Sequence, residues 1–309
     1  MLRSMPSVRF SLSISTARGG DGPVSARSLT RYGALAEELG FHALYVTDHF
    51  LYSGPAMHSV SALAVLAGAT TRVRLGFAAY VLPLRHPLQA AKELAMLDGL
   101  SEGRLIAAFA PGSYAPEFAA MGIPFAERGA RLDEGLAAVC ALWTERPASY
   151  EGRFYRFSGV TPEPGVVQRP HPPLWIGAWT GNERAARRVA RFAAGWQASG
   201  LHTTVEEVRT GWAAIRRACA LVDRDPATVG RAYVNAVTWL DADRERAWGT
   251  VTPGLREHEE LRLIGTPDDA ARKIEALAEA GIEEVAMLLP SWDEGQLRLI
   301  ARELMPVFA

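Results

Sequence analysis

The sequence has little lysine and little cysteine. Only Lys92 and Lys273 are lysine among the 33 basic residues, a bias that we attribute to a GC-rich genome and not to chemistry. The two cysteines, Cys140 and Cys219, lie in apolar helical patterns, which favours buried thiols over a disulfide framework. We therefore expect a protein of the reducing cytoplasm.

An excess of charge of one sign is also missing. The 33 basic and 34 acidic side chains give a net charge of -1, which lacks the basic footprint of a nucleic-acid-binding protein or a membrane-surface helix. No run of about 18 apolar residues occurs, and the residues before Phe10 lack the apolar core of a signal peptide. We expect neither a nucleic acid nor a membrane as a partner.

Several catalytic motifs are absent. The sequence has no G-x-G-x-x-G after a strand, no phosphate loop ending in Gly-Lys-Ser/Thr, no G-x-S-x-G, no H-E-x-x-H and no C-x-x-C. No two histidines lie four residues apart on a clear helix face, so we predict no metal site. These absences argue against a Rossmann dehydrogenase, a kinase, an α/β hydrolase and a zinc enzyme.

What the sequence does contain is an alternation of short apolar runs with amphipathic helical stretches. The 309 residues, 49% of them hydrophobic, are enough for one large α/β domain or for two smaller domains. Eight runs read as strands: Arg9–Ser15, Ala43–Thr47, Val73–Leu82, Arg104–Ala110, Leu174–Trp179, Gly195–Ser199, Ala232–Leu240 and Glu284–Leu289. The clearest helical patterns are Ser28–Leu39, Ser59–Ala69, Leu88–Leu100, Arg131–Trp143, Glu183–Ala194, Val205–Val222 and Asp268–Ala280. This order predicts one (β/α)8 TIM barrel over residues 1–309.

The longest gap between strands separates the fourth from the fifth. Residues 111–173 hold one helical pattern, a hairpin-like alternation at Ser149–Phe157 and a proline-rich stretch. We interpret this segment as an insertion over the catalytic mouth of the barrel and not as a second domain. Elsewhere, Gly40 and Gly281 follow helical patterns and precede strands, as expected of glycines that end helices.

The sharpest local feature is an acid and a histidine at the end of the second strand. Asp48 and His49 follow Ala43–Thr47 directly, and strand ends in a barrel point into its mouth. A histidine there can donate or accept a proton near neutral pH. The alternative is that Asp48 is a turn residue and His49 a solvated or core ring. Tyr52 and Tyr114 also follow strands and are expected to line the pocket.

A series of motifs, in order along most of the chain, resembles the luciferase-like monooxygenase family of flavin- and deazaflavin-dependent barrels. They are Ala36–Phe41, Val46–Phe50, Arg72–Gly76, Leu82–Pro87, Ala91–Asp98, Leu100–Arg104, Pro124–Glu134, Leu142–Trp143, Gly152–Phe157, Gln168–Pro173, Gly195–Trp196 and Gly265–Asp268. The resemblance implies a barrel with a reduced flavin, or the deazaflavin coenzyme F420, in its mouth. It also implies that His49, with Asp48 beside it, is the catalytic proton relay.

The resemblance further implies where the cofactor binds. It matches Ala78-Ala79 to a bulge with a cis peptide behind the cofactor ring, Ala110 and Gly112 to a glycine-rich loop, and residues 177–182 to a loop that binds the cofactor phosphate. From the residues alone, the alternatives are two core alanines, a plain Pro-Gly turn and a helix capped by Thr180 or Asn182. The expected cofactor-binding residues are Ala78, Ala79, Tyr80, Ala110, Gly112, Gly177, Ala178, Trp179, Thr180, Gly181 and Asn182.

We therefore expect an oxidoreductase that uses F420 for hydride transfer to or from a small organic substrate, which the sequence does not identify. One alternative is an FMN-dependent two-component monooxygenase that receives reduced flavin from a separate reductase. Another is a flavin-binding protein without catalysis. The resemblance also implies a homodimer, with the insertion and the neighbouring helices at the interface.

Overall fold

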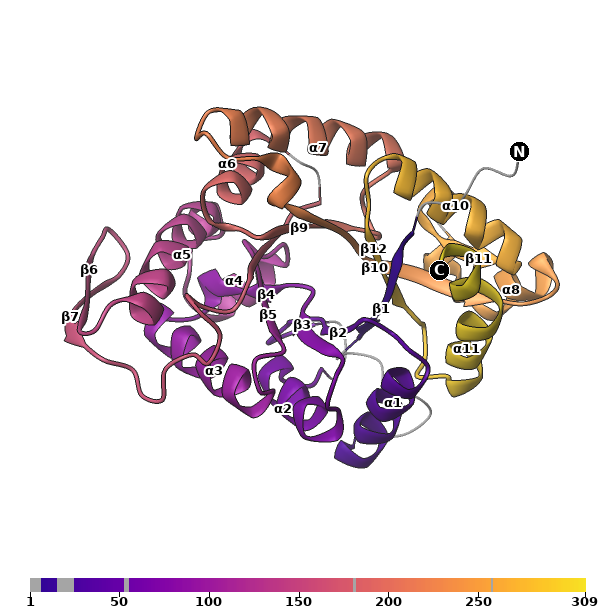
Figure 1. Cartoon of the computed structure of the whole chain (residues 1–309), viewed down its shortest axis with the longest axis horizontal. Coiled ribbons are helices and arrows are strands. Elements are labelled where there is room, and N and C mark those ends of the chain that lie inside the picture. The colour runs from indigo at the N-terminus through magenta and orange to yellow at the C-terminus, as the bar shows by residue number, and fades with distance from the viewer. Residues whose placement is uncertain (1–6, 16–24, 53–55, 180–181, 257) are drawn as a thin grey trace.

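The computed structural model describes residues 7–15, 25–52, 56–179, 182–256 and 258–309, which fold around a closed barrel of parallel strands (Figure 1). The third barrel strand is formed by two segments, β3 and β4, and a short strand, β11, pairs with β10 outside the ring. The barrel strands are β1 (Arg9–Ile14), β2 (Ala43–Val46), β3 (Arg74–Phe77), β4 (Tyr80–Val81), β5 (Leu105–Ala110), β8 (Leu174–Gly177), β9 (Gly195–Ser199), β10 (Gly230–Leu240) and β12 (Glu284–Leu288).

The strand order follows the chain around the barrel. β1 pairs with β2, and the sheet runs through β3, β5, β8 and β9 to β10 and β12, which pairs with β1 again. Leu12 lies opposite Leu44 in the first of these pairings, and Arg9 lies opposite Glu284 in the last. The predicted (β/α)8 barrel is thereby confirmed.

A helix on the outer surface follows each barrel strand (Figure 1). These helices are α1 (Ala26–Glu38), α2 (Ser59–Ala69), α3 (Pro87–Leu100), α5 (Arg128–Thr144), α6 (Glu183–Phe192), α7 (Val205–Ala220), α10 (Pro267–Glu279) and α11 (Glu294–Leu299). Three shorter helices, α4 (Ala115–Ala120), α8 (Arg244–Thr250) and α9 (Pro253–Arg256), lie in the connections.

Local sequence signals fix where several helices begin and end. Ser25, Thr204 and Thr266 begin α1, α7 and α10 with capping boxes, in which side chain and backbone satisfy each other's N–H groups. Gly40 and Gly281 have φ angles of +88° and +101°, a region that glycine enters without a steric cost. The prediction that these two glycines follow helix ends is therefore confirmed.

Two apolar layers lie on either side of the strands. The outer layer, between strands and helices, is the main core, and a smaller cluster fills the inside of the barrel. Trp175 is the largest side chain of the inner cluster, and it fits because Gly195 and Gly230 lie beside it. A Cβ atom on Gly195 would approach the indole ring of Trp175 to 2.4 Å. The inner cluster comprises Ala43, Tyr45, Ala78, Ile106, Ala108, Trp175, Ala232, Val234 and Ala286.

The third strand differs from its prediction. One continuous strand was expected over Val73–Leu82, but β3 ends at Phe77 and β4 begins at Tyr80, and the Ala78-Ala79 peptide bond between them is cis. The cis bond implied by the family resemblance is confirmed. A 3₁₀ turn at Leu82–Leu84 then leads the chain towards α3.

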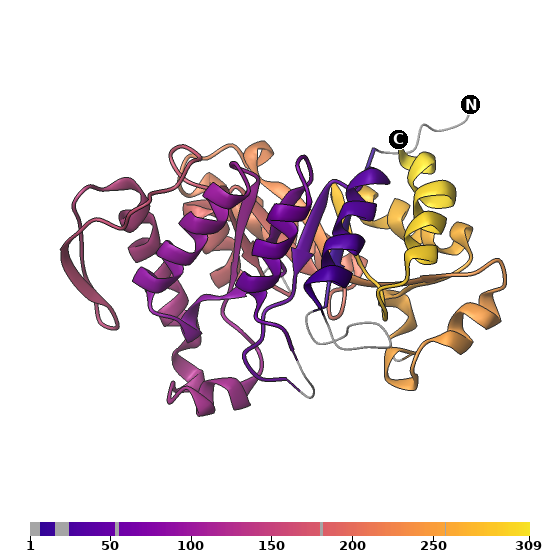
Figure 2. The same ribbon diagram turned by 90° about the horizontal axis from the view of Figure 1, so that it is seen from below.

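The segments of the insertion lie at different places on the barrel. Its hairpin, β6 (Ala148–Glu151) and β7 (Arg156–Val160), confirms the predicted alternation and projects from the side of the barrel in both views (Figures 1 and 2). After the hairpin, the N–H groups of Val167 and Gln168 donate to Asp98 near the end of α3. Tyr114 and the α4 residue Glu117, from the first part of the insertion, reach the residues at the end of β2. The expectation that the whole insertion covers the mouth is therefore wrong for the hairpin, because it packs beside α5.

Candidate active site

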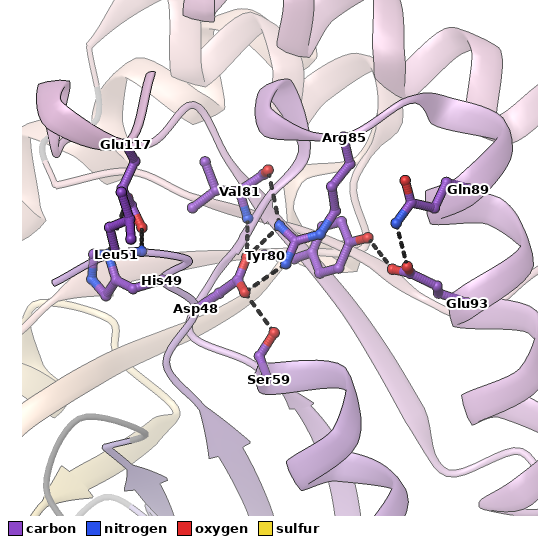
Figure 3. Close-up of polar contacts among 10 residues, drawn as sticks. All are labelled: Asp48, His49, Leu51, Ser59, Tyr80, Val81, Arg85, Gln89, Glu93 and Glu117. Atoms are coloured by element: carbon purple, nitrogen blue, oxygen red, sulfur yellow. Dashed lines mark hydrogen bonds and ion pairs between the residues drawn. The ribbon is translucent and has the colours of Figure 1, made fainter. Parts of the chain in front are cut away.

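His49 lies directly after β2, at the carboxyl-terminal ends of the strands, which we call the mouth. Its Nδ1 is 3.2 Å from Oε2 of Glu117, and its side chain is 24% exposed (Figure 3). The ring of Tyr52 lies 4.5 Å from the imidazole and that of Tyr114 lies 6.4 Å away, centroid to centroid. His49 is thus held on one side and accessible on another, as a group that moves protons requires.

Glu117 was not among the residues predicted from the sequence. It lies on α4, 68 residues from His49, and its side chain is only 1% exposed. Its other oxygen, Oε1, accepts the N–H of Leu51 at 2.9 Å. No spacing rule links residues so far apart, and the one sequence signal was a glutamate in the segment that follows a strand end.

Asp48 and His49 are neighbours in sequence but bind different partners. Both oxygens of Asp48 accept from Arg85, at 2.8 and 2.9 Å, and its side chain is 1% exposed. Asp48 also accepts from Ser59 Oγ at 2.5 Å and from the N–H of Val81 at 2.8 Å (Figure 3). A buried carboxylate needs such partners. These contacts make Asp48 a clamp between the end of β2 and β4.

Arg85 is enclosed by this clamp and by two aromatic rings. Its guanidinium carbon lies 4.3 Å from the ring centroid of Phe50 and 4.0 Å from that of Tyr80. Burial opposes the charge on Arg85, but the adjacent Asp48 raises the pKa of the guanidinium above its ordinary value. The motifs around His49 and Arg85, both of which carried the family resemblance, are thereby joined by one buried ion pair.

Tyr80 was expected to line the cofactor site, and the structure directs its side chain elsewhere. The ring is fully buried among Phe77 and Phe109, and its hydroxyl donates to Glu93 on α3 at 2.8 Å. Burial, together with Glu93, raises the pKa of this hydroxyl well above its ordinary value. The side chain of Tyr80 is therefore part of the core between barrel and helix, and only its backbone continues from Ala79.

Three small residues predicted for the cofactor site come together at the mouth. A Cβ atom on Gly177 would lie 2.9 Å from Cβ of Ala79 and 3.4 Å from Cβ of Ala110. Ala79 lies between β3 and β4, and Ala110 and Gly177 are the last residues of β5 and β8. The three residues are half-buried and pack against one another, so small side chains line the barrel next to the Ala78-Ala79 bond.

Two amide side chains reach this cis bond from inside the barrel. Gln197 Nε2 donates to the carbonyl of Phe77 at 3.1 Å, and Asn235 Nδ2 donates to that of Ala78 at 3.1 Å. Their oxygens, Gln197 Oε1 and Asn235 Oδ1, are buried without a hydrogen-bond partner among the described residues. Buried polar atoms are rarely left unpaired, so these two acceptors fit the N–H groups of a polar ring. Neither residue was predicted from the sequence.

Gly112 has the backbone conformation that a glycine-rich loop requires. Its φ is +80°, and a Cβ atom there would lie 2.6 Å from Val81 and 2.9 Å from Phe118. Glycine is therefore required at this position by both conformation and packing. This arrangement keeps the loop after β5 close to β4 and α4.

The loop after β8 begins with backbone bonds and ends in a helix cap. The N–H of Ala178 donates to the backbone carbonyl of Gln197 at 3.0 Å, and the carbonyl of Ala178 accepts from the indole of Trp196. Trp179 is 48% exposed, and its ring lies 4.1 Å from that of His202. Asn182 caps α6 by accepting the N–H of Ala185. The predicted residues Thr180 and Gly181 lie outside the described residues.

The described residues contain no group of three or more His, Cys, Asp or Glu side chains arranged to hold a metal ion. Within the same residues, no helix is both long and apolar enough to cross a membrane.

The sequence is similar to those of known proteins of one family. The family profile described as luciferase-like monooxygenase matches residues 5–262. The oxygenase component of a flavin-dependent trigonelline monooxygenase from Acinetobacter baylyi is 30% identical over 69% of this chain, and the match spans 60% of that protein. An F420-dependent glucose-6-phosphate dehydrogenase from Intrasporangium calvum is 32% identical over 55% of this chain and 53% of its own length.

The fold agrees with these sequence matches. The crystal structure of monooxygenase RslO1 from Streptomyces bottropensis superposes with a TM-score of 0.84, at 28% identity, over 98% of this chain and all of that one. Relatives named as flavin-dependent monooxygenases and relatives named as F420-dependent enzymes both match. The chain belongs to the luciferase-like monooxygenase family.

Proposed function

We propose that this protein is an F420-dependent oxidoreductase that moves a hydride between the deazaflavin and a small organic substrate. The observation that carries the proposal is the position of His49, which lies partly exposed at the mouth, where the small residues Ala79, Ala110 and Gly177 are themselves half-buried. The choice of F420 rests on the resemblance of the segments around His49 and Arg85 to deazaflavin members of the family.

The residues at the mouth fit a flat, polar ring. We propose that the ring lies against Ala78-Ala79, with the unpaired oxygens of Gln197 and Asn235 as acceptors for ring N–H groups. Residues 177–182, at the start of α6, would bind the phosphate, since helix N-terminal amides favour anions. This part of the proposal includes Gly177, Ala178, Trp179, Thr180, Gly181 and Asn182 as predicted.

A bound deazaflavin accepts or donates a hydride and reacts poorly with oxygen. His49 would take or return the proton that accompanies this transfer at the substrate, through the ring nitrogen that does not face Glu117. Asp48 contacts no reacting atom in this account. It is a positioning residue that, with Arg85, holds the backbone on which His49 stands.

A second candidate is an FMN-dependent monooxygenase supplied by a separate reductase. It is favoured by relatives whose names specify that activity, among them an FMNH2-dependent dimethylsulfone monooxygenase from Pseudomonas putida, 28% identical over 88% of this chain. The same small residues and amide oxygens would accept a flavin ring, so this mouth does not separate the two cofactors by shape.

Anaerobic titration of the purified protein with F420 and with FMN, each oxidised and reduced, tests the proposal through ligand fluorescence. The expected result is saturable binding of F420 with weaker binding of FMN. Preference for reduced FMN would replace the proposal by the monooxygenase, and binding of neither would overturn both. Binding of cofactor without turnover of any reducible or oxidisable substrate would favour the non-catalytic alternative.

We also propose a homodimer. Met96 and Leu100 on α3 are 39% and 55% exposed, and Val167 of the neighbouring insertion is 55% exposed. Exposed apolar side chains such as these favour association with another copy. Light scattering coupled to size exclusion measures the mass directly, and a monomer at micromolar concentration would contradict this proposal. The cytoplasmic location stays a prediction.

A further inference from the structure

We infer that Glu117 is a positioning residue that fixes the tautomer of His49, with the proton on Nδ1 and Nε2 presented unprotonated to the mouth. The role given to that Nε2 in proton transfer rests on the proposed function. The tautomer itself does not, because it follows from contacts within this chain.

The donors around Glu117 determine the tautomer. Oε1 accepts the N–H of Leu51 at 2.9 Å, and Oε2 faces Nδ1 of His49 at 3.2 Å. An ionised carboxylate can only accept hydrogen bonds, whereas a neutral imidazole has one donor and one acceptor nitrogen. With Glu117 as a carboxylate that accepts from Leu51 and from His49, we assign the donor role to Nδ1, which leaves the lone pair on Nε2.

Glu117 is held firmly enough to impose this choice. Its side chain is 1% exposed, and the next residue, Phe118, is buried against Phe125, with ring centroids 5.3 Å apart. The bond to Leu51 ties the same carboxylate to the segment that carries His49. One side chain thus fixes both the ring nitrogen and the backbone two residues beyond it. This is the arrangement by which a second partner usually selects a histidine tautomer.

For the variant Glu117→Gln we predict the opposite tautomer of His49. The N–H of Leu51 still needs an acceptor, so the amide oxygen of the variant should turn to it. The amide NH2 would then face Nδ1 of His49 as a donor. The imidazole would then accept a hydrogen bond at Nδ1 and carry its proton on Nε2. Nε2, which is presented to the mouth, would change from an acceptor to a donor.

Nitrogen-15 NMR of protein labelled at histidine measures the tautomer in the full-length chain without cofactor, at a pH where the ring is neutral. We expect Nδ1–H in the wild type and Nε2–H in Glu117→Gln. The matched control is Glu93→Gln, because Glu93 bonds Tyr80 and Gln89 and makes no contact with His49. That control should keep the wild-type tautomer.

Two results would overturn the inference: Nε2–H in the wild type, or Nδ1–H retained in Glu117→Gln. The wild-type spectrum alone decides the first, even if the variant does not fold. Titration of the wild type with F420 is a separate measurement and keeps the two proposals apart. Failure of the wild type to bind F420 would count against the proposed function and would leave the tautomer result intact.

Discussion

The ion pair between Asp48 and Arg85 makes the strongest prediction about stability. Arg85→Met removes the guanidinium while keeping a long apolar side chain between Phe50 and Tyr80. Asp48 would lose both of its donors from Arg85 and keep those from Ser59 and Val81, in a place where its side chain is 1% exposed. Breaking a buried pair costs about 3–5 kcal/mol. Because two donors remain, we expect a loss of about 3 kcal/mol in the free energy of unfolding.

Denaturant unfolding followed by tryptophan fluorescence measures this loss. The matched control is Arg146→Met, because Arg146 pairs with Glu163 at the surface, with side chains 47% and 61% exposed. Such an exposed pair contributes about 0–1 kcal/mol. The double variant Arg85→Met with Asp48→Asn should lose less free energy of unfolding than the sum of the losses in the two single variants. If Arg85→Met is no more destabilising than Arg146→Met, the clamp does not stabilise the fold and our reasoning is refuted.

Three further predictions concern other parts of the chain. Gly112→Ala should lower the free energy of unfolding by at least about 1 kcal/mol more than Gly122→Ala does, since both glycines have positive φ but, of the two, only Gly112 has side chains within 3 Å of a new Cβ atom. Burial opposes the charge on Glu37, but backbone N–H groups of residues 71–73 lower its pKa to about 2. Glu37→Gln should therefore destabilise the protein at pH 7, with the difference from wild type shrinking as pH falls below about 4.5; an unchanged difference at pH 3 would contradict this. Burial raises the pKa of Cys140 to about 11 and also raises that of Cys219. Neither thiol should react with a disulfide reagent at pH 7 before the protein unfolds. Rapid labelling of the native protein would contradict the burial of the two thiols.

The fold was predictable because its signals are local. Alternation of apolar strands with amphipathic helices, and glycines at positions such as Gly40 and Gly281, depend on residues close together in sequence. The break in the third strand was different. Ala78 and Ala79 have the composition of an ordinary buried strand, and only the family resemblance pointed to the cis bond between them.

The site was less predictable because its contacts join distant segments. His49 could be chosen from its place after a strand, but its partner Glu117 is 68 residues away, and Arg85 is 37 residues from Asp48. The acid–histidine pair in the sequence thus indicated two important residues while missing the partner of each. Tyr80 shows the reverse case, since its position beside Ala79 gave no sign that its side chain turns into the core.

The central claim is that a deazaflavin ring binds against the cis Ala78-Ala79 bond within reach of His49. A crystal structure of the protein with oxidised F420 tests it most directly. We predict the ring against Ala79 and Gly177, its polar edge bonded to Gln197 or Asn235, and the unprotonated nitrogen of His49 facing the space beside the ring. Well-defined density for the ring at any other place on the barrel would contradict the account.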